Sequence, residues 1–254
     1  MTETSPSFGS DSTRRQLSRT VAATACVTLL VVGTIAVAWE GKPTPAFLVG
    51  VGGAFLAVTV VNRRTLARAR AIAGSQPLTT ATWVTLARGW LLIAFAGFLF
   101  TDPPNGPTAW VPAGLFAAAA GLDAIDGALA RRTDAVSELG GRLDTEIDSL
   151  LVAVGAVTVV LDGRAPLVLL AVGGARYAFV GGIRWRRARD LAVYELDPSR
   201  LRRVAGAIVM LTVWIALLPV VDLGLSRAIA TVGSIPVLFQ FVRDWLFVSG
   251  RIDR

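Results

Sequence analysis

Long uncharged apolar runs are the feature that most constrains how this chain folds. Four runs contain no charged residue: 20–39, 43–62, 103–122 and 204–221. Each is about as long as a helix needs to cross roughly 30 Å of hydrocarbon. The mean hydropathy, +0.61, is also high for a chain of this size. Because the bilayer core offers no water to backbone groups, and no stretch alternates like a barrel strand, these runs predict an all-α polytopic membrane protein.

Apolar and charged stretches together predict about eight transmembrane helices. They are expected near residues 17–39, 45–61, 79–100, 109–131, 138–161, 166–186, 203–221 and 227–248. Residues 1–13 are polar and small, and residues 1–16 are predicted to form a disordered cytoplasmic tail. The first apolar run is long and lacks a small-residue cleavage site before Trp39, so we expect it to be a retained helix rather than a signal peptide.

Basic residues predict the orientation of these spans. With eight crossings, most of the 25 Lys and Arg fall on the side that holds both termini. Lys42, Arg164 and Arg227 fall on the other side, and Arg176 lies within a span. The positive-inside rule therefore predicts an integral protein of the cell membrane with both termini in the cytoplasm. The cluster RRTLARAR, residues 63–70, is typical of a segment that contacts anionic membrane lipids. This bias explains the pI near 11.0, so we expect no nucleic-acid partner.

Acidic residues gather in DAIDGALARRTDAVSELGGRLDTEID, residues 123–148, where two predicted helices meet at the cytoplasmic side. One helix face carries Asp123, Asp126, Gly127, Ala130 and Arg131. The next helix presents Gly140, Asp144 and Asp148 at four-residue spacing, which also defines one face. If the two helices pack side by side, four carboxylates come together over Gly and Ala.

Four clustered carboxylates would repel one another at this depth unless they were paired or bound to cations. The chain has no His, and its one Cys lies in an apolar run, so a metal site would use oxygen ligands. Such ligands favour Mg²⁺ or Mn²⁺, and four carboxylates suit two ions and phosphoryl chemistry. Alternatively, the Asp side chains form interhelical ion pairs with Arg131, Arg132 and Arg142.

The spacing Asp-x2-Asp-Gly-x2-Ala-Arg-x8-Gly-x3-Asp-x3-Asp, which begins at Asp123 and ends at Asp148, resembles the signature of the CDP-alcohol phosphotransferase (CDP-alcohol phosphatidyltransferase) family. The resemblance covers about residues 74–250, which would form the family's six-helix core. Residues 17–73 would be two extra transmembrane helices and a basic juxtamembrane segment. The resemblance implies transfer of a phosphatidyl-type group from a CDP-activated lipid to a small alcohol, with release of CMP. It also implies a homodimer.

Residue roles follow from the same resemblance. Asp123, Asp126 and Asp144 would bind metal, and Asp148 would be the catalytic base while also touching the second metal. The CDP part of the donor would be bound by Gly127, Ala130, Arg131, Ser137 and Gly140. The segment Thr82-Trp-Val-Thr85-Leu-Ala-Arg88 is similar to an Asn-x-x-Thr-x-x-Arg motif of the family, with Thr82 in place of Asn. Thr85 and Arg88 are therefore further candidates for donor binding.

Several alternatives remain open. Intramembrane carboxylates also occur in membrane transporters, although those usually place them near the midplane. The acceptor could be a sugar phosphate or glycerol phosphate, or an alcohol such as serine. Arg176 would bind an acceptor phosphate or pair with an Asp. The basic segment 181–203 would set topology and contact lipid, or contribute Arg200, Arg202 or Arg203 to an anionic acceptor pocket.

Overall fold

The structure, a computed structural model, describes residues 8–38, 44–73, 80–133, 138–196 and 199–252. Within these ranges it does not describe the side chains of residues 8–17, 36–38, 66, 68–73, 80–82, 123–133, 138–140 and 142. The described residues form helices and connecting segments, without a strand.

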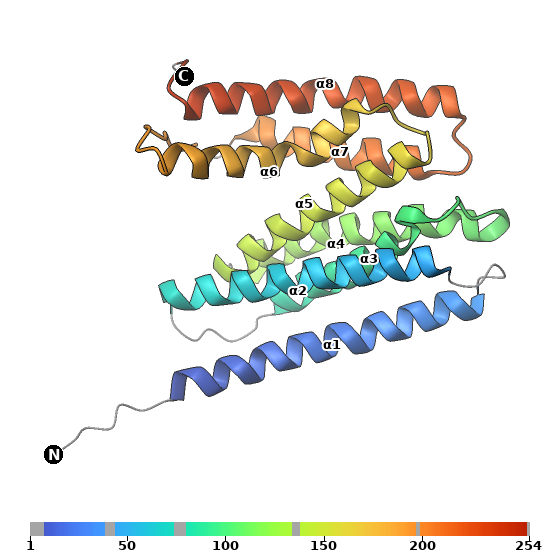
Figure 1. The fold of residues 1–254 in the computed structure, drawn as a ribbon, viewed down its shortest axis with the longest axis horizontal. Coiled ribbons are helices and arrows are strands. Elements are labelled where there is room, and N and C mark those ends of the chain that lie inside the picture. The colour runs from blue at the N-terminus through green and yellow to red at the C-terminus, as the bar shows by residue number, and fades with distance from the viewer. Residues whose placement is uncertain (1–7, 39–43, 74–79, 134–137, 197–198, 253–254) are drawn as a thin grey trace. The chain divides into compact units, whose positions relative to one another are not determined.

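Eight α-helices account for most of these residues (Figure 1). They are α1 (Phe8–Ala38), α2 (Pro45–Ala73), α3 (Thr80–Ala96), α4 (Val111–Thr133), α5 (Glu138–Leu161), α6 (Val168–Arg187), α7 (Arg200–Leu217) and α8 (Leu223–Val248), with short 3₁₀ helices η1 (Gly97–Phe100) and η2 (Gly106–Trp110). The predicted all-α architecture with eight helices is confirmed. α1 begins at Phe8, earlier than the boundary predicted at residue 17, and α7 ends at Leu217 rather than near 221.

Four segments are long and apolar enough to cross a membrane by length and composition: Ser18–Ile35, Pro45–Thr65, Trp83–Phe100 and Leu223–Val248. They belong to α1, α2, α3 with η1, and α8. The other four helices, α4 to α7, also contain charged residues. The acidic stretch 123–148 occupies the facing ends of α4 and α5, and arginines occupy the end of α6 and the start of α7. By length alone, α4 and α5, with 23 and 24 residues, could also cross a bilayer.

The chain divides into two compact units. The first comprises Met1–Thr101 with Leu115–Asp148, and the second comprises Asp102–Gly114 with Ser149–Arg254. The boundary falls within α5, directly after Asp148.

In the first unit, α2 packs closely along α3 and η1. Gly50 of α2 lies against the backbone of Ala96, so that a Cβ at residue 50 would overlap the Ala96 carbonyl oxygen. In the same way, the Phe47 ring fills the space where a Cβ on Gly97 would be. Phe47 is fully buried and meets the Phe98 ring edge-on, with centroids 5.3 Å apart. Two glycines therefore allow the backbones of α2 and α3 to approach, as is common between membrane helices.

Replacing Gly50 by Ala is expected to destabilise the protein, because the new methyl group would meet backbone that cannot rotate away. Overpacking of this kind typically costs about 1–3 kcal/mol. Gly53, one turn further along α2, is the matched control, since a Cβ there would meet nothing within 4 Å. Thermal unfolding in detergent measures both. A Gly50→Ala protein as stable as Gly53→Ala would contradict the close packing described here.

Helix α1 also packs on α3 and presents a row of threonines to the interior. Thr20, Thr24 and Thr28 recur every fourth residue and are buried. The Trp90 indole Nε1 of α3 donates a 3.1 Å hydrogen bond to the Thr24 hydroxyl oxygen. The two N-terminal helices thus both contact α3, the helix that carries Thr85 and Arg88.

In the second unit, α8 packs against both α6 and α7. Arg164, in the turn between α5 and α6, donates hydrogen bonds to the carbonyl oxygens of Ala216, Leu218 and Val221, at 2.5, 2.6 and 2.9 Å. The Ser226 hydroxyl in turn donates to the Arg164 carbonyl oxygen at 2.8 Å. This predicted non-cytoplasmic arginine therefore ties the α5–α6 turn to the end of α7 and the start of α8.

Burial raises the pKa of the Asp162 carboxyl to about 6, although Arg164 opposes the shift. Asp162 follows the last residue of α5, and the nearby Asp102 adds to the rise. The turn therefore contains a carboxyl group that is held partly away from water beside the Arg164 guanidinium.

Candidate active site

The centre of the candidate site in the first unit is the guanidinium of Arg88. This side chain of α3 is completely buried. Its Nε donates a 2.9 Å hydrogen bond to the Ala119 carbonyl oxygen of α4. Its two terminal nitrogens form ion pairs with Asp144 and Asp148 of α5, one nitrogen to each carboxylate. One side chain thus links three helices, and the planar guanidinium fork is suited to such divided contacts.

The sequence of α5 explains why both carboxylates face Arg88. Asp144 and Asp148 are one helical turn apart and so lie on one face. Leu143 and Ile147 occupy the adjoining face and are buried, at 4% and 1% exposure. Ile147 packs beside Gly89 of α3, where a Cβ would lie at an ordinary contact distance of 3.5 Å from the Ile147 Cδ1. Apolar packing therefore fixes the rotation of α5 and directs the two carboxylates toward Arg88.

The two carboxylates are paired but still accessible. Their side chains are 29% and 31% exposed, whereas that of Arg88 is not exposed at all. A buried cation beside two partly exposed anions lowers the cost of placing carboxylates at this depth. Carboxylate oxygens are also the type of atom that hard cations bind and that can accept a proton.

Only part of the predicted site falls within the described side chains. Thr85 is buried, at 1% exposure, one turn before Arg88. The backbone is helical at Asp123, Asp126, Gly127, Ala130, Arg131 and Gly140, but their side chains lie outside the described part, as does Ser137 entirely. Among the described residues, no group of three or more His, Cys, Asp or Glu could hold a metal ion. The predicted four-Asp cluster and the roles of its members therefore stay predictions.

Arg88 has a role that the sequence pattern did not indicate. The resemblance made it a candidate for donor binding, whereas the structure pairs it with two of the predicted metal-site carboxylates. A signal was present in the sequence, since Arg88 lies in an otherwise uncharged stretch, 79–100. A lone arginine at such a position calls for a carboxylate partner.

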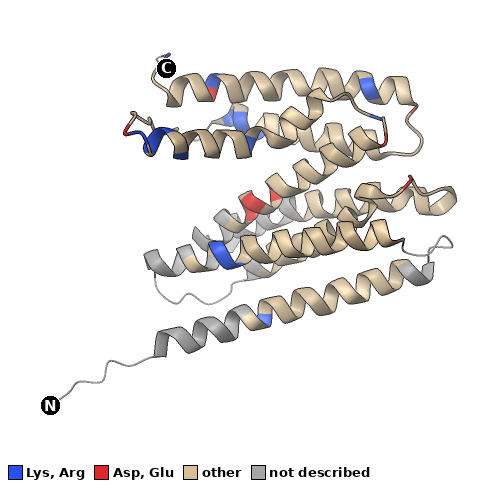
Figure 2. Ribbon diagram, viewed as in Figure 1, with Lys and Arg blue, Asp and Glu red and all other residues tan. Residues whose placement is uncertain are grey.

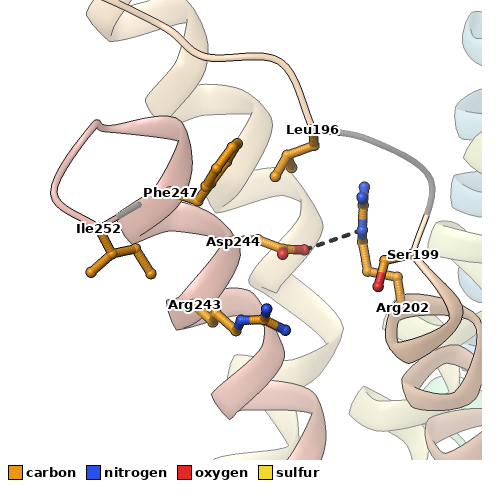
Figure 3. A pocket seen from close by; sticks show the side chains of 7 residues that line it. All are labelled: Leu196, Ser199, Arg202, Arg243, Asp244, Phe247 and Ile252. Carbon is orange, nitrogen blue, oxygen red and sulfur yellow. Dashed lines mark ion pairs between the residues drawn. The ribbon is translucent and has the colours of Figure 1, made fainter. Parts of the chain in front are cut away.

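A second cluster of charges lines a pocket in the second unit (Figure 3). Arg202 of α7 points toward Asp244 of α8, with 3.5 Å between the Arg202 Nε and the Asp244 Oδ2. The Gln240 amide nitrogen donates a 2.7 Å hydrogen bond to the other Asp244 oxygen. The lining residues are Leu196, Ser199, Arg202, Arg243, Asp244, Phe247 and Ile252.

The pocket combines two arginines with one carboxylate, so its charge is net positive. Arg202 was predicted as a possible acceptor contact, whereas Arg243 and Asp244 were not singled out. Their signal was a charged pair within the apolar helix predicted at 227–248. Of the other predicted candidates, Arg200 and Arg203 are exposed and do not line the pocket, and Arg176 lies half-buried in α6.

Comparison with known proteins identifies the family. The sequence model of the family described as CDP-alcohol phosphatidyltransferase matches residues 78–242. The chain belongs to the CDP-alcohol phosphatidyltransferase family. It is 25% identical over 135 residues to the archaetidylinositol phosphate synthase of Aeropyrum pernix (strain K1). That match covers 52% of this chain and 66% of the relative, slightly less than two thirds of the relative's length.

Family membership agrees with the reaction class that the sequence resemblance implied, and the matched family is one of polytopic membrane proteins. This assignment favours the transferase over the transporter alternative. The matched residues include α3 to α7 and most of α8, and they leave α1 and α2 outside.

Proposed function

We propose that this enzyme transfers a phosphatidyl-type group from a CDP-activated lipid to a small alcohol that itself carries a phosphate, and releases CMP. The observation that carries the proposal is the group formed by Arg88, Asp144 and Asp148 in a chain of this family. Two accessible carboxylates held by one buried guanidinium provide a base and oxygen ligands at the same place. The donor's apolar chains would remain in the bilayer while its diphosphate reaches this group.

The residues fit the divalent metal that the family generally requires. Asp144 and Asp148 offer only oxygen atoms, the chain has no His, and hard cations prefer such ligands. Together with Asp123 and Asp126 of α4, they would hold two Mg²⁺ or Mn²⁺ ions. Bound metal would supply positive charge that neutralises the donor diphosphate and improves CMP as a leaving group.

The chain's own side chains would transfer the proton and position the substrates. Asp148 would take the proton of the acceptor hydroxyl, because an alcohol attacks phosphorus poorly until that proton leaves. Arg88 would hold the Asp148 carboxylate in place through its ion pair. Thr85, Gly127, Ala130, Arg131, Ser137 and Gly140 would position the CDP headgroup.

The pocket of the second unit supports an acceptor with a phosphate group. Arg202 and Arg243 provide planar guanidinium groups, which suit phosphate oxygens. Asp244 and Ser199 could bind hydroxyl groups of the same molecule. The name of the Aeropyrum relative, a synthase of archaetidylinositol phosphate, points to the same acceptor class. We therefore favour inositol phosphate over glycerol 3-phosphate and serine.

The charge distribution supports a cytoplasmic location for the site and both termini. Figure 2 shows basic residues at the end of α6 and at the start of α7, and acidic residues in α5. The end of α6 and the start of α7 border the same loop, so the positive-inside rule places that loop in the cytoplasm. A homodimer remains a prediction from the resemblance.

Release of CMP by the purified enzyme tests the reaction. CDP-diacylglycerol in mixed micelles would be combined with inositol phosphate, inositol, glycerol 3-phosphate or serine, with Mg²⁺, Mn²⁺ or EDTA. We expect CMP release only with metal, and at least about tenfold faster with inositol phosphate than with inositol. Full activity in excess EDTA would contradict the metal assignment. Equal rates of CMP release with inositol phosphate and with inositol would contradict the acceptor assignment.

Replacing Arg243 by Gln tests the acceptor pocket. The variant loses one guanidinium contact with the acceptor phosphate, so we expect the KM for inositol phosphate to rise about tenfold, the loss of a single charge-assisted hydrogen bond. The KM for the CDP-lipid should stay unchanged. Arg251→Gln is the matched control, because Arg251 is exposed and does not line the pocket. Equal acceptor KM values in the two variants would exclude Arg243 from the acceptor site.

A further inference from the structure

The segment from Arg184 to Glu195 joins the end of α6 to the loop before α7 and combines arginines with exposed apolar side chains. We call it the basic hairpin. The last turn of α6 contains Arg184, Arg186 and Arg187, and Arg189 follows directly. Three large apolar residues are exposed among them: Trp185 at 49%, Leu191 at 42% and Tyr194 at 55%.

One arginine of the basic hairpin holds its shape. The Arg186 guanidinium donates hydrogen bonds to the Ala192 carbonyl oxygen at 3.1 and 2.8 Å, and to the Ser249 carbonyl oxygen at 3.3 Å. The chain reverses at Asp190, which has a left-handed φ of 53°. The Tyr194 amide then donates to the Val248 carbonyl oxygen at 3.1 Å. The hairpin is thus a folded element fastened to the end of α8.

The other arginines face outward. Arg184, Arg187 and Arg189 are exposed, and Arg189 lies over the Trp185 ring with its Cζ 4.4 Å from the ring centroid. Asp190 and Glu195 are the acidic residues of the hairpin, so its net charge is positive. Stacking on Trp185 restrains the Arg189 guanidinium while leaving its edge available to a phosphate.

The position of the hairpin identifies its partner. It follows the apolar stretch of α6, and because the family is one of polytopic membrane proteins, we infer that it lies in the headgroup layer. Trp and Tyr concentrate at that depth because one end of each ring is apolar and the other polar. Exposed arginines beside such rings attract anionic headgroups, at about fivefold in affinity for each arginine.

We propose that the basic hairpin is a binding site for an anionic phospholipid, with Arg184, Arg187 and Arg189 on the headgroup phosphate and Trp185, Leu191 and Tyr194 against the lipid. The site is separate from the acceptor pocket but shares its supports. Leu196 and Ser199, which follow the hairpin, line the pocket, and so do Arg243, Asp244 and Phe247 near the α8 end to which the hairpin is fastened. Lipid bound to the hairpin therefore restrains the two chain segments whose side chains line the pocket.

Fluorescence quenching by brominated lipids tests the binding. The protein would be placed in phosphatidylcholine nanodiscs that contain equal fractions of brominated phosphatidylglycerol or brominated phosphatidylcholine. The signal of Trp185, one of seven Trp, is the difference between wild type and Trp185→Phe. We expect markedly stronger quenching of Trp185 by the anionic lipid, and 1 M NaCl should abolish this preference because salt screens exposed charges. Equal quenching by both lipids would overturn the proposal.

Two double variants show whether the hairpin itself is responsible. Arg184→Ser with Arg187→Ser should lower the apparent affinity for brominated phosphatidylglycerol about 30-fold, two arginines at about fivefold each. Arg63→Ser with Arg64→Ser is the matched control, since these α2 arginines are also exposed and should leave Trp185 quenching unchanged. Both variants keep Arg186, so thermal unfolding should match the wild type. If the two variants lowered the apparent lipid affinity equally, the binding would depend on general surface charge and not on the hairpin.

The effect on the pocket rests on the proposed function and has its own measurement. The KM for inositol phosphate should fall several-fold when phosphatidylglycerol replaces phosphatidylcholine, and this response should disappear in the Arg184/Arg187 variant. If anionic quenching is found without any CMP release in the wild type, the lipid site stands and the proposed function fails. If anionic quenching and CMP release are both found but the KM for inositol phosphate does not change with the lipid, the proposed coupling between the hairpin and the pocket is wrong.

Discussion

Replacing Asp148 by Asn is expected to lower the transfer rate by about 10²–10⁴-fold while the CDP-lipid still binds. Asn keeps the shape of the side chain, and its amide oxygen can still accept a hydrogen bond from the Arg88 nitrogen that now meets Asp148. It cannot take a proton from the acceptor hydroxyl. Asp144, one turn away, is unchanged in this variant. Metal binding should therefore be disturbed less than proton transfer from the acceptor hydroxyl.

Donor affinity and single-turnover rate, measured on the same Asp148→Asn protein, decide this prediction. Donor affinity should stay within about tenfold of wild type, the lower end of the effect of disturbing a metal site. Glu146→Gln is the control, because it removes a carboxylate from the same helix on a face different from that of Asp144 and Asp148. A parallel fall in affinity and rate would make Asp148 a metal ligand without a role as base.

The helices could be predicted from the sequence because the bilayer imposes a length and an apolar composition on each of them. The acidic spacing also predicted that Asp144 and Asp148 share a face, since that follows from helix geometry alone. Helix ends were less predictable. α1 starts at Phe8 within a polar stretch that lacks an apolar pattern, and the end of α7 at Leu217 precedes the end of the uncharged run.

Contacts between helices could not be predicted in the same way. The pairing of Arg88 with two carboxylates joins residues 56 and 60 positions apart, and it depends on how the buried Leu143 and Ile147 set the rotation of α5. The pocket likewise depends on Arg202 and Asp244, which lie on different helices. A sequence shows that each such charge needs a partner, whereas packing decides which partner it meets.

Replacing Arg88 by Met is expected to abolish CMP release and to weaken the fold. The change removes the hydrogen bond to Ala119 and leaves Asp144 and Asp148 without their shared cation. Loss of one partner from a buried ion pair costs about 3–5 kcal/mol. The lower end applies here, because the carboxylates are about a third exposed and water can solvate them in part. We expect a rate at least about 100-fold below wild type.

Arg88→Lys separates charge from geometry. Lys keeps the positive charge, but one ammonium group cannot reach Ala119, Asp144 and Asp148 in the directions that the planar guanidinium serves. We therefore expect Lys to recover part of the thermal stability and little of the activity. A cycle in which Arg88→Met is combined with Asp144→Asn and Asp148→Asn measures the coupling, since Met should destabilise the neutralised site much less than the wild-type site. If the stability losses were additive, Arg88 would not be coupled to the two carboxylates. If Arg88→Lys had wild-type turnover, the positive charge alone, and not the guanidinium geometry, would be what activity requires.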